Sequence, residues 1–581
     1  MAYTAPVRDI AFALAHQAGF ARVAALAPEA DADTVSAVLE AAGVFTAQVL
    51  APLNRSGDLT GATYENGRVT AAPGFADAYR AFAGQGWTGL SASPDHGGQG
   101  LPKALEIGVY EMVSAANMAF SLCPILTQGA IEALAHHGTE RQKALILPRL
   151  VSGEWTGTMN LTEPQAGSDL SAVTTRAEPD GEGGYRLKGE KIFITWGDHD
   201  GADNIIHLVL ARLPGAPAGV KGISLFAASK RMINADGSLG GLNDLRPASI
   251  EHKLGIHASP TCVMLFEGAK AELVGVENQG LAHMFTMMNA ARLQVGTQGV
   301  GIAERAYQQA LAFSLERRQG RSAWTGEASA PIFDHPDVRR TLIFMKAKVD
   351  AARAICLSTA VAADLARLAS DPAEREAARL REELLTPIAK AWSTDVGVEV
   401  ASLGVQIHGG MGFIEETGAA QHYRDARIAP IYEGTNAIQA IDLIGRKLSM
   451  AGGGAIASLL ADMRATAADL AGGELADIGA RLSQGVEAAS ACTDWLTTHK
   501  GTPDALAGAT AYLGLLGDVV GGWMHAKAAK AAAGNSEPWM QGKVAVARFY
   551  AEQILAQAPG KAAAVTQGIK ALEIGLEALQ A

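Results

Sequence analysis

The sequence predicts an α+β protein in which helices and strands occupy separate stretches of the chain. Residues 1–154 and 276–581 carry apolar positions three or four apart, the spacing of amphipathic helices. Residues 155–275 instead contain short alternating or β-branched runs bounded by Gly, Pro and Asp, which indicate strands. No long helical pattern separates these strands, so we expect a small antiparallel β-barrel rather than a parallel sheet.

Four regions follow from these patterns, each predicted from its own periodicity. They are an N-terminal helical domain (1–154), the middle antiparallel β-barrel (155–275), a helical bundle (276–450) and an extra C-terminal helical domain (451–581). The clearest helical patterns cover 34–42, 103–118 and 340–368, and the clearest strand patterns cover 185–195, 205–210 and 223–226. Gly452-Gly453-Gly454 predicts a flexible boundary before the last region. Gly296, Gly299 and Gly301 follow no strand, so we interpret them as close helix packing rather than a dinucleotide fingerprint.

Composition excludes several classes of protein. With 48% hydrophobic and 19% charged residues, the 581-residue chain is globular rather than disordered. Its net charge of -12 argues against nucleic-acid binding, and residues 451–581 are themselves acidic, with nine Lys/Arg against twelve Asp/Glu. Four cysteines without a CxxC pair predict free thiols in a reducing compartment and no metal site. We find no targeting segment and no stretch of about 18 uninterrupted apolar residues, so we expect a cytoplasmic protein without a membrane partner.

Two segments of the predicted barrel suit a polar, flat ligand. Residues 158–169 run from a strand into a turn rich in hydroxyls, Gly and free backbone N–H groups, which bind anionic ligands. Phe193-Ile194-Thr195 offers an aromatic face beside a hydroxyl, which suits stacking and hydrogen bonding to a ring. Taken singly, these segments could equally be an ordinary turn and a core aromatic.

A glycine-rich segment, Gln406-Ile407-His408-Gly409-Gly410-Met411-Gly412-Phe413, lies in the helical bundle. Glycines at three of four positions allow a backbone to approach a pyrophosphate closely. A glycine loop alone is a weak signal.

The third segment, residues 424–436, contains a candidate general base. Glu433 follows the apolar Ala429-Pro430-Ile431 and precedes Gly434. A carboxylate in an apolar wall is costly when ionised, so its pKa rises toward neutrality and suits proton abstraction. A lone Glu in this context could also be a solvated loop residue.

In their order, these segments resemble the acyl-CoA dehydrogenase family over roughly residues 40–450. The resemblance rests on Thr162-Glu163-Pro164-Gln165-Ala166-Gly167-Ser168-Asp169, Phe193-Ile194-Thr195, Glu316-Arg317-Arg318, the glycine segment and Arg424-Asp425-Ala426-Arg427 with Ile431-Tyr432-Glu433-Gly434-Thr435-Asn436. It implies helical, β-barrel and four-helix-bundle domains, FAD as cofactor and α,β-dehydrogenation of an acyl-CoA thioester.

The resemblance also assigns residues. It implies Glu433 as the base, since the alternative position, within 289–292, holds no carboxylate. It implies flavin contacts from Leu161, Thr162, Ser168, Phe193, Thr195 and Thr435, and contacts across a subunit interface from Arg317, Gln406 and Gly410. Substrate contacts are implied for Ser168, Asn289, Arg292 and Gly434. Phe193 replaces the family's usual Trp, and Gln319-Gly320 replaces an aromatic-Gly pair, which leaves that edge of the cofactor site open.

The length indicates a longer bacterial branch, because compact members end soon after the glutamate motif. The resemblance implies 3-methylmercaptopropionyl-CoA, from dimethylsulfoniopropionate breakdown, as substrate; ordinary short and medium acyl-CoAs are the alternative. Met284, Met287 and Met288 could line a soft pocket for the thioether or belong to a helix core. The implied partners are electron-transfer flavoprotein and a second copy, in a homodimer or tetramer. An acyl-CoA oxidase and a DNA-binding flavoprotein of the same fold are the rivals.

Overall fold

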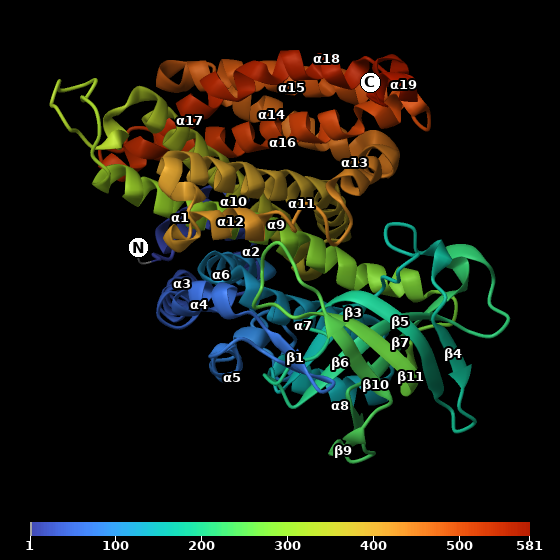
Figure 1. Ribbon diagram of the computed structural model, residues 1–581. Coiled ribbons are helices and arrows are strands. Elements are labelled where there is room, and N and C mark those ends of the chain that lie inside the picture. The colour runs from blue at the N-terminus through green and yellow to red at the C-terminus, as the bar shows by residue number, and fades with distance from the viewer. Residues whose placement is uncertain (1–2, 581) are drawn as a thin grey trace.

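The computed structural model describes residues 3–580, and its N-terminal region is helical as predicted. Figure 1 shows these helices beside the β region, with the C-terminal helices stacked along the far side of the central bundle. The predicted α+β class, with helices, sheet and helices in that order, is confirmed. The N-terminal elements are α1 (Val7–Phe12), α2 (Phe20–Leu26), α3 (Ala32–Phe45), α4 (Ala51–Thr60), β1 (Thr63–Glu65), β2 (Arg68–Thr70), α5 (Phe75–Gly84), α6 (Lys103–Ala116), α7 (Met118–His137) and α8 (Glu140–Val151).

The β region closes into a barrel. Strand β11 pairs with β5 and β7, and the order β11-β5-β4-β6-β7 returns to β11 as a ring of five strands. The strands are β3 (Trp155–Asn160), β4 (Arg176–Pro179), β5 (Tyr185–Thr195), β6 (Asn204–Arg212), β7 (Ile223–Ser229), β8 (Arg231–Ile233), β9 (Leu239–Leu242), β10 (Leu245–Ile250) and β11 (Thr261–Val274).

The predicted antiparallel pairing holds for most of the barrel, but β6 has parallel neighbours. β3 runs parallel to β6 in full register from Trp155 opposite Asn204 to Asn160 opposite Val209, and β4 meets β6 in the same sense. Parallel neighbours need a long connection, and we expected that connection to be a helix. Here the chain between β3 and β6 is long enough because it forms β4 and β5 on the way.

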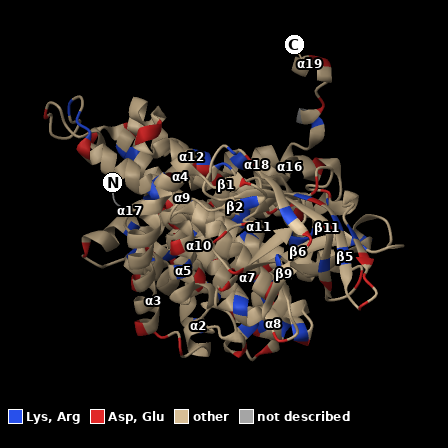
Figure 2. Ribbon diagram, turned by 60° about the horizontal axis from the view of Figure 1, so that its bottom comes forward, with Lys and Arg blue, Asp and Glu red and all other residues tan. Residues whose placement is uncertain are grey.

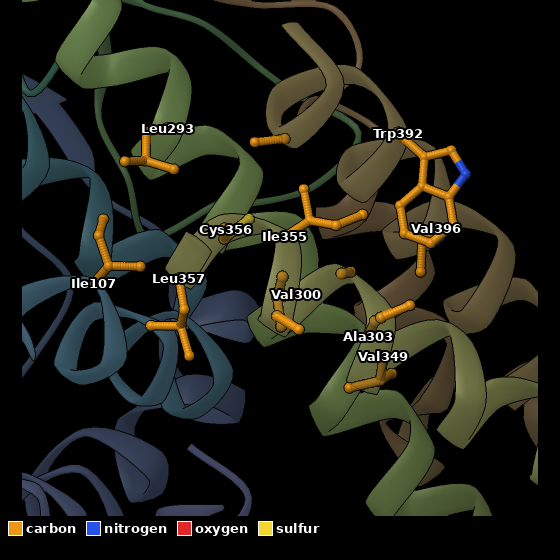
Figure 3. Close-up of a cluster of buried hydrophobic side chains, with 14 of the residues drawn as sticks. Ile107, Leu293, Val300, Ala303, Val349, Ile355, Cys356, Leu357, Trp392 and Val396 are labelled. Atoms are coloured by element: carbon orange, nitrogen blue, oxygen red, sulfur yellow. The ribbon is translucent and has the colours of Figure 1, made fainter. Parts of the chain in front are cut away.

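Three long helices form the central bundle. They are α9 (Gly280–Glu316), α10 (Pro336–Leu368) and α11 (Pro372–His408), followed by the shorter α12 (Ala419–Ala426) and α13 (Asn436–Gly445). The predicted close packing at glycines is confirmed: a Cβ on Gly296 or Gly299 would overlap backbone carbonyl oxygens of α11. Figure 3 shows the apolar side chains that fill the space around this contact, among them Leu293, Val300 and Trp392.

Residues beyond 453 form a further helical layer on the bundle. Its helices are α14 (Gly454–Asp469), α15 (Ala476–Thr498), α16 (Pro503–Ala532), α17 (Pro538–Gln553), α18 (Ala558–Thr566) and α19 (Leu576–Gln580). Asp518 of α16 joins the layers, because its Oδ1 accepts from Lys348 Nζ at 2.9 Å and Trp392 Nε1 at 3.1 Å. Basic and acidic residues are interspersed along the ribbon in Figure 2, where α19 projects from the body.

Three helical stretches are long and apolar enough to cross a membrane, judged by length and composition alone. They are Ala32–Thr60, Met118–His137 and Pro503–Ala532, with 33%, 89% and 72% of their most apolar windows buried in the protein. The sequence criterion of uninterrupted apolar runs missed them, because an averaged window tolerates single polar residues. The last two are mostly buried among other helices, and the first buries Leu39, Phe45 and Leu50 against the core.

Candidate active site

Glu433 lies in a tight turn immediately before α13. Its backbone has φ of 56°, in the left-handed region that non-glycine residues rarely adopt, and Gly434 follows with φ of 84°. The turn is closed by a hydrogen bond from the Asn436 N–H to the Pro430 carbonyl at 3.0 Å. Thr435 caps α13 by accepting the Ile438 N–H at 3.3 Å. Such local strain persists where surrounding contacts fix it, which is typical of functional sites.

Glu433 lines a small, partly open cavity with mainly apolar walls and a volume of about 20 Å³. The cavity lies between α7, α9, the end of β5 and the Glu433 turn. Its lining residues are Leu122, Ile125, Leu126, Thr195, Ala291, Val295, Gln298, Tyr432 and Glu433. The structure thus brings two predicted site residues, Thr195 of the barrel and Glu433 of the bundle, to one cavity.

Two cations flank Glu433 without bonding to it. Within the described residues, Arg292 donates to Asn289 Oδ1 at 3.1 Å and Lys390 donates to Asn436 Oδ1 at 2.8 Å, and neither forms an ion pair with the glutamate. Burial raises the pKa of Glu433 to about 7, although the charges of Arg292 and Lys390 hold it down. Burial also lowers the pKa of Arg292 and brings the pKa of Lys390 to about 7. The glutamate can therefore accept a proton near neutral pH.

The sequence did not predict a short chain of hydrogen-bonded side chains beside Glu433. The Tyr432 hydroxyl donates to Gln298 Oε1, and Gln298 Nε2 donates to Ser121 Oγ at 3.1 Å. This chain of hydrogen bonds links the Glu433 turn to α9 and α7. Tyr432 belongs to the glutamate motif, but the motif alone assigns it no function. Gln298 and Ser121 belong to no recognisable motif.

The predicted cofactor residues of the barrel are accessible. Leu161, Thr162 and Thr195 are half-buried, Ser168 is exposed, and Phe193 is 58% exposed with φ of 60°. Phe193 is no core aromatic: it lies where the β5–β11 register shifts, so the bulge turns its ring outward.

The adjoining turn is fixed by the buried Glu163. This carboxylate accepts from the Thr174 N–H at 2.7 Å, the Thr175 N–H at 3.0 Å and Lys191 Nζ at 2.8 Å. Burial works against its charge, yet Lys191 and these hydrogen bonds lower the pKa of Glu163 to about 2. Glu163 is thus a structural member of the turn that presents Ser168.

Three predicted residues lie far from this cavity. Arg317 follows Arg292 by 25 positions along α9, which corresponds to about 37 Å at ~1.5 Å per residue. Phe313 stacks on His408 at 4.4 Å between ring centroids, so the ends of α9 and α11 bring Arg317, Gln406 and Gly410 to the same end of the bundle. All three are exposed, and nothing lies within 4 Å of a Cβ placed on Gly410. Within a single chain, these three residues therefore do not share a site with Glu433.

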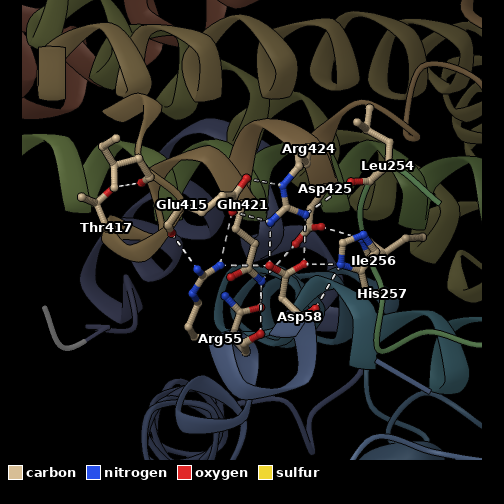
Figure 4. Close-up of polar contacts among 12 residues, drawn as sticks. Arg55, Asp58, Leu254, Ile256, His257, Glu415, Thr417, Gln421, Arg424 and Asp425 are labelled. Carbon is tan, nitrogen blue, oxygen red and sulfur yellow. Dashed lines mark hydrogen bonds and ion pairs between the residues drawn. The ribbon is translucent and has the colours of Figure 1, made fainter. Parts of the chain in front are cut away.

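The Arg424-Asp425 motif connects the helical bundle to the N-terminal helices and to the barrel. Figure 4 shows Arg424 bonded to Asp58 of α4, at 2.6 Å and 3.0 Å from its two terminal nitrogens. Asp425 accepts the Ile256 N–H at 2.5 Å from the loop before β11. These contacts hold the segment that leads into the Glu433 turn against both the N-terminal helices and the barrel.

The methionines do not form a soft pocket. Met284 and Met287 are fully buried in the core between α9 and the barrel, with Met288 packed against that core, and none lines the cavity. The helix-core alternative is the one that the structure supports. Asn289 is exposed and bonded to Arg292, whose terminal nitrogen lies 3.9 Å from a Cβ placed on Gly434, so these predicted substrate residues do adjoin Glu433.

Comparison with known proteins identifies the class. Family models match residues 33–154 (acyl-CoA dehydrogenase, N-terminal domain), 158–269 (middle domain), 278–449 (C-terminal domain) and 459–573 (acetyl-CoA dehydrogenase C-terminal like). The chain belongs to the acyl-CoA dehydrogenase family and is an oxidoreductase that acts on acyl-CoA.

Individual proteins show how similar this chain is to particular acyl-CoA dehydrogenases. The chain is 47% identical over 579 residues to a 3-methylmercaptopropionyl-CoA dehydrogenase of Ruegeria pomeroyi, covering 97% of this chain and 98% of the relative. It is 38% identical to a butyryl-CoA dehydrogenase of Syntrophomonas wolfei over 68% of this chain and 67% of the relative. A Bacillus anthracis acyl-CoA dehydrogenase solved with FAD shares the fold, with a TM-score of 0.76, 21% identity and coverage of 95% and 91%.

Proposed function

We propose that this enzyme oxidises 3-methylmercaptopropionyl-CoA to methylthioacryloyl-CoA with Glu433 as the general base. The observation that carries the assignment of the base is a carboxylate, held in a strained turn over an apolar cavity, whose pKa is about 7. The relative of that specificity matches this chain over nearly its whole length, which supports the thioether substrate.

The cofactor is FAD, and the exposed groups of the barrel fit it. Phe193 offers an outward aromatic face, Thr195 lines the cavity beside it, and Leu161, Thr162 and Ser168 border the neighbouring turn. When bound, FAD supplies the acceptor for the hydride that leaves the β-carbon. Thr435, close to the Glu433 turn, would complete the contacts from the bundle.

The residues of this chain then have defined tasks. Glu433 takes the α-proton, and its own backbone N–H would donate to the thioester carbonyl and stabilise negative charge there. The aliphatic wall formed by Leu122, Ile125 and Leu126 would receive the acyl chain and exclude water. Ser168, Asn289, Arg292 and Gly434 would contact the rest of the substrate.

A second copy of the chain would complete the cofactor site. Because Arg317, Gln406 and Gly410 lie at the opposite end of the bundle from Glu433, they can serve only a flavin held by another subunit. The exposed Met411, Phe413 and Ile414 beside them form an apolar surface that suits such an interface. We therefore propose a homodimer as the minimum assembly and a tetramer as its doubling.

The physiological setting is proposed on chemical grounds. All four cysteines are free, as expected in the reducing cytoplasm. Electron-transfer flavoprotein is the proposed electron acceptor. The acidic residues 451–581 give no support to the DNA-binding rival.

An acyl-CoA panel tests this function. The purified protein, reconstituted with FAD, is assayed with 3-methylmercaptopropionyl-CoA and with pentanoyl-CoA, in which a methylene replaces the sulfur, using an artificial acceptor and then oxygen. We expect the highest kcat/KM for the thioether and little hydrogen peroxide. A preference for pentanoyl-CoA would favour the general short-chain enzyme, rapid peroxide formation an oxidase, and failure to bind FAD would refute the assignment.

A further inference from the structure

Lys390 is a buried lysine that forms no ion pair with a carboxylate among residues 3–580. Its side chain is completely buried in α11, and its Nζ donates to the amide oxygen of Asn436 at 2.8 Å. Burying an ammonium group is costly unless an opposite charge or several hydrogen bonds compensate it. Other buried lysines of the bundle have such partners; Lys348, for example, bonds to Asp518 at 2.9 Å. Lys390, which lacks such a partner, lies beside the Glu433 turn.

Asn436 connects this lysine to the catalytic turn. Its Nδ2 donates to the Ala391 carbonyl at 3.0 Å, Thr394 Oγ1 at 3.0 Å and Asp395 Oδ1 at 2.7 Å, all on α11. Its backbone N–H closes the turn that contains Glu433 by binding the Pro430 carbonyl. One residue therefore clamps the turn to α11, and Lys390 is the cationic member of the clamp.

The approach of two helices places this charge close to the base. A Cβ on Gly296 of α9 would overlap the carbonyl oxygen of Ala389, the neighbour of Lys390. This close contact brings Arg292 of α9 and Lys390 of α11 to the Glu433 turn from different helices. With bulkier residues at Gly296 and Gly299, α11 could not approach so closely.

We infer that Lys390 is a positioning residue for Glu433: through Asn436 it holds the strained turn in place, and its charge favours the ionised carboxylate. The inference rests on the proposed role of Glu433. It gives this lysine a role in the reaction without contact with the substrate.

The charged groups around the turn define what a substitution would change. Glu433 is influenced by Arg292 from α9 and Lys390 from α11; Asp395 on α11 acts on Lys390, and Asp442 and Arg446 of α13 act on Arg292. Arg292 keeps its charge in any Lys390 variant. The pKa of Lys390 is itself about 7, so removing the lysine withdraws a positive charge that is present chiefly below neutral pH, where the ascending limb lies. The burial of Glu433 is left unchanged.

The test compares pH profiles of FAD-loaded variants. In Lys390→Met we expect the ascending limb of kcat/KM to move up by about one pH unit or more, since the loss of a nearby opposite charge raises the pKa of a carboxyl group. Activity at pH 7 should fall about fivefold or more, because less of Glu433 is ionised there, and should recover in part at higher pH. Lys390→Gln, which retains a donor for Asn436 but no charge, should show the same displacement with a smaller loss of stability.

Two matched variants make the test decisive. Lys348→Met removes a buried lysine of α10 that lies outside the cavity, and should lower the melting temperature without moving the pH profile. Lys390→Arg restores the charge and should return the profile toward that of the wild type. Flavin content and melting temperature are measured for every variant, so that misfolded protein is excluded.

The outcomes distinguish the inferred role of Lys390 from the proposed role of Glu433. Wild-type pH profiles in both neutral Lys390 variants, or an equal displacement in Lys390→Arg, would overturn the role of Lys390 while Glu433→Gln remained inactive. Full turnover in Glu433→Gln would instead refute the proposed base itself.

Discussion

Two sets of buried charges in the same helical bundle are arranged in opposite ways. In the first, Arg353 of α10 bonds to Glu111 at 2.6 Å, Glu304 at 2.8 Å and Asp350 at 3.0 Å. In the second, Glu433 has Arg292 and Lys390 nearby but bonds to neither. The first network is extended by Lys346, which bonds to Asp9 at 2.9 Å and to Asp350 at 2.8 Å.

The difference separates buried charges that have direct partners from a buried carboxylate that has none. Direct contacts with its carboxylates raise the pKa of Arg353 well above its usual range despite burial, and the cations around Asp350 lower the pKa of that carboxyl. These contacts tie α1, α6, α9 and α10 together, although burial still raises the pKa of Glu111 to about 7 despite its bond to Arg353. Glu433 lacks direct partners, so burial dominates and its proton can exchange near neutrality.

The largest expected effect comes from breaking the structural network. Arg353→Met would leave the carboxylates of Glu111, Glu304 and Asp350 buried without their common partner, which should cost about 3–5 kcal/mol of unfolding free energy. Denaturant unfolding measures this loss. Arg340→Met, which removes an exposed ion pair on the same helix, should cost less than about 1 kcal/mol. Equal stability of the two variants would contradict the structural role of the network.

The next largest effect distinguishes Glu433, the proposed base, from other glutamates. Glu433→Gln should fold and bind FAD but lose on the order of 10²-fold or more in rate, because the amide accepts no proton. Single-turnover bleaching of the flavin measures the chemical step. Glu399→Gln, a half-exposed carboxylate on α11, should keep normal turnover. Comparable losses in both variants would point to general damage to the bundle.

The pH dependence of the wild-type enzyme sharpens the same contrast. Only ionised Glu433 can take a proton, and its pKa is about 7. We therefore expect kcat/KM to fall about tenfold per pH unit below pH 7 and to level off above it. Steady-state rates across this range, with FAD saturating, provide the measurement. A profile that stayed flat down to about pH 5 would mean a base with an ordinary carboxyl pKa.

The smallest effect concerns the polar chain at the cavity wall. Tyr432→Phe removes the hydroxyl that donates to Gln298, a net loss of about 1 kcal/mol or roughly fivefold in kcat/KM if the bond supports the reactive geometry. Tyr423→Phe, on the exposed side of α12, provides the control. Equal kcat/KM values for the two variants would mean that the hydrogen-bond chain from Tyr432 does not support the reactive geometry.

Local patterns predicted most of the secondary structure and some of the site. Alternation in 185–195 gave β5 within its observed bounds, and the apolar context of Glu433 anticipated its raised pKa. The parallel β3–β6 pair, the burial of Met284 and Met287 in a core, and the chain of Tyr432, Gln298 and Ser121 were not predictable. Each depends on which distant segment packs opposite, and periodicity carries no such information.

The sequence by itself determined the order of helices and strands, the family and the candidate base, because these depend on local spacing and on motifs. Only the tertiary structure decided which charges share a site. Lys390 and Arg292 meet at Glu433 because glycines of α9 let α11 approach closely. Arg317 is about 37 Å from Arg292 because it directly follows the end of the continuous helix α9, which contains Arg292. A pKa near 7 is therefore a property of the fold, since it depends on burial and on charges from distant segments.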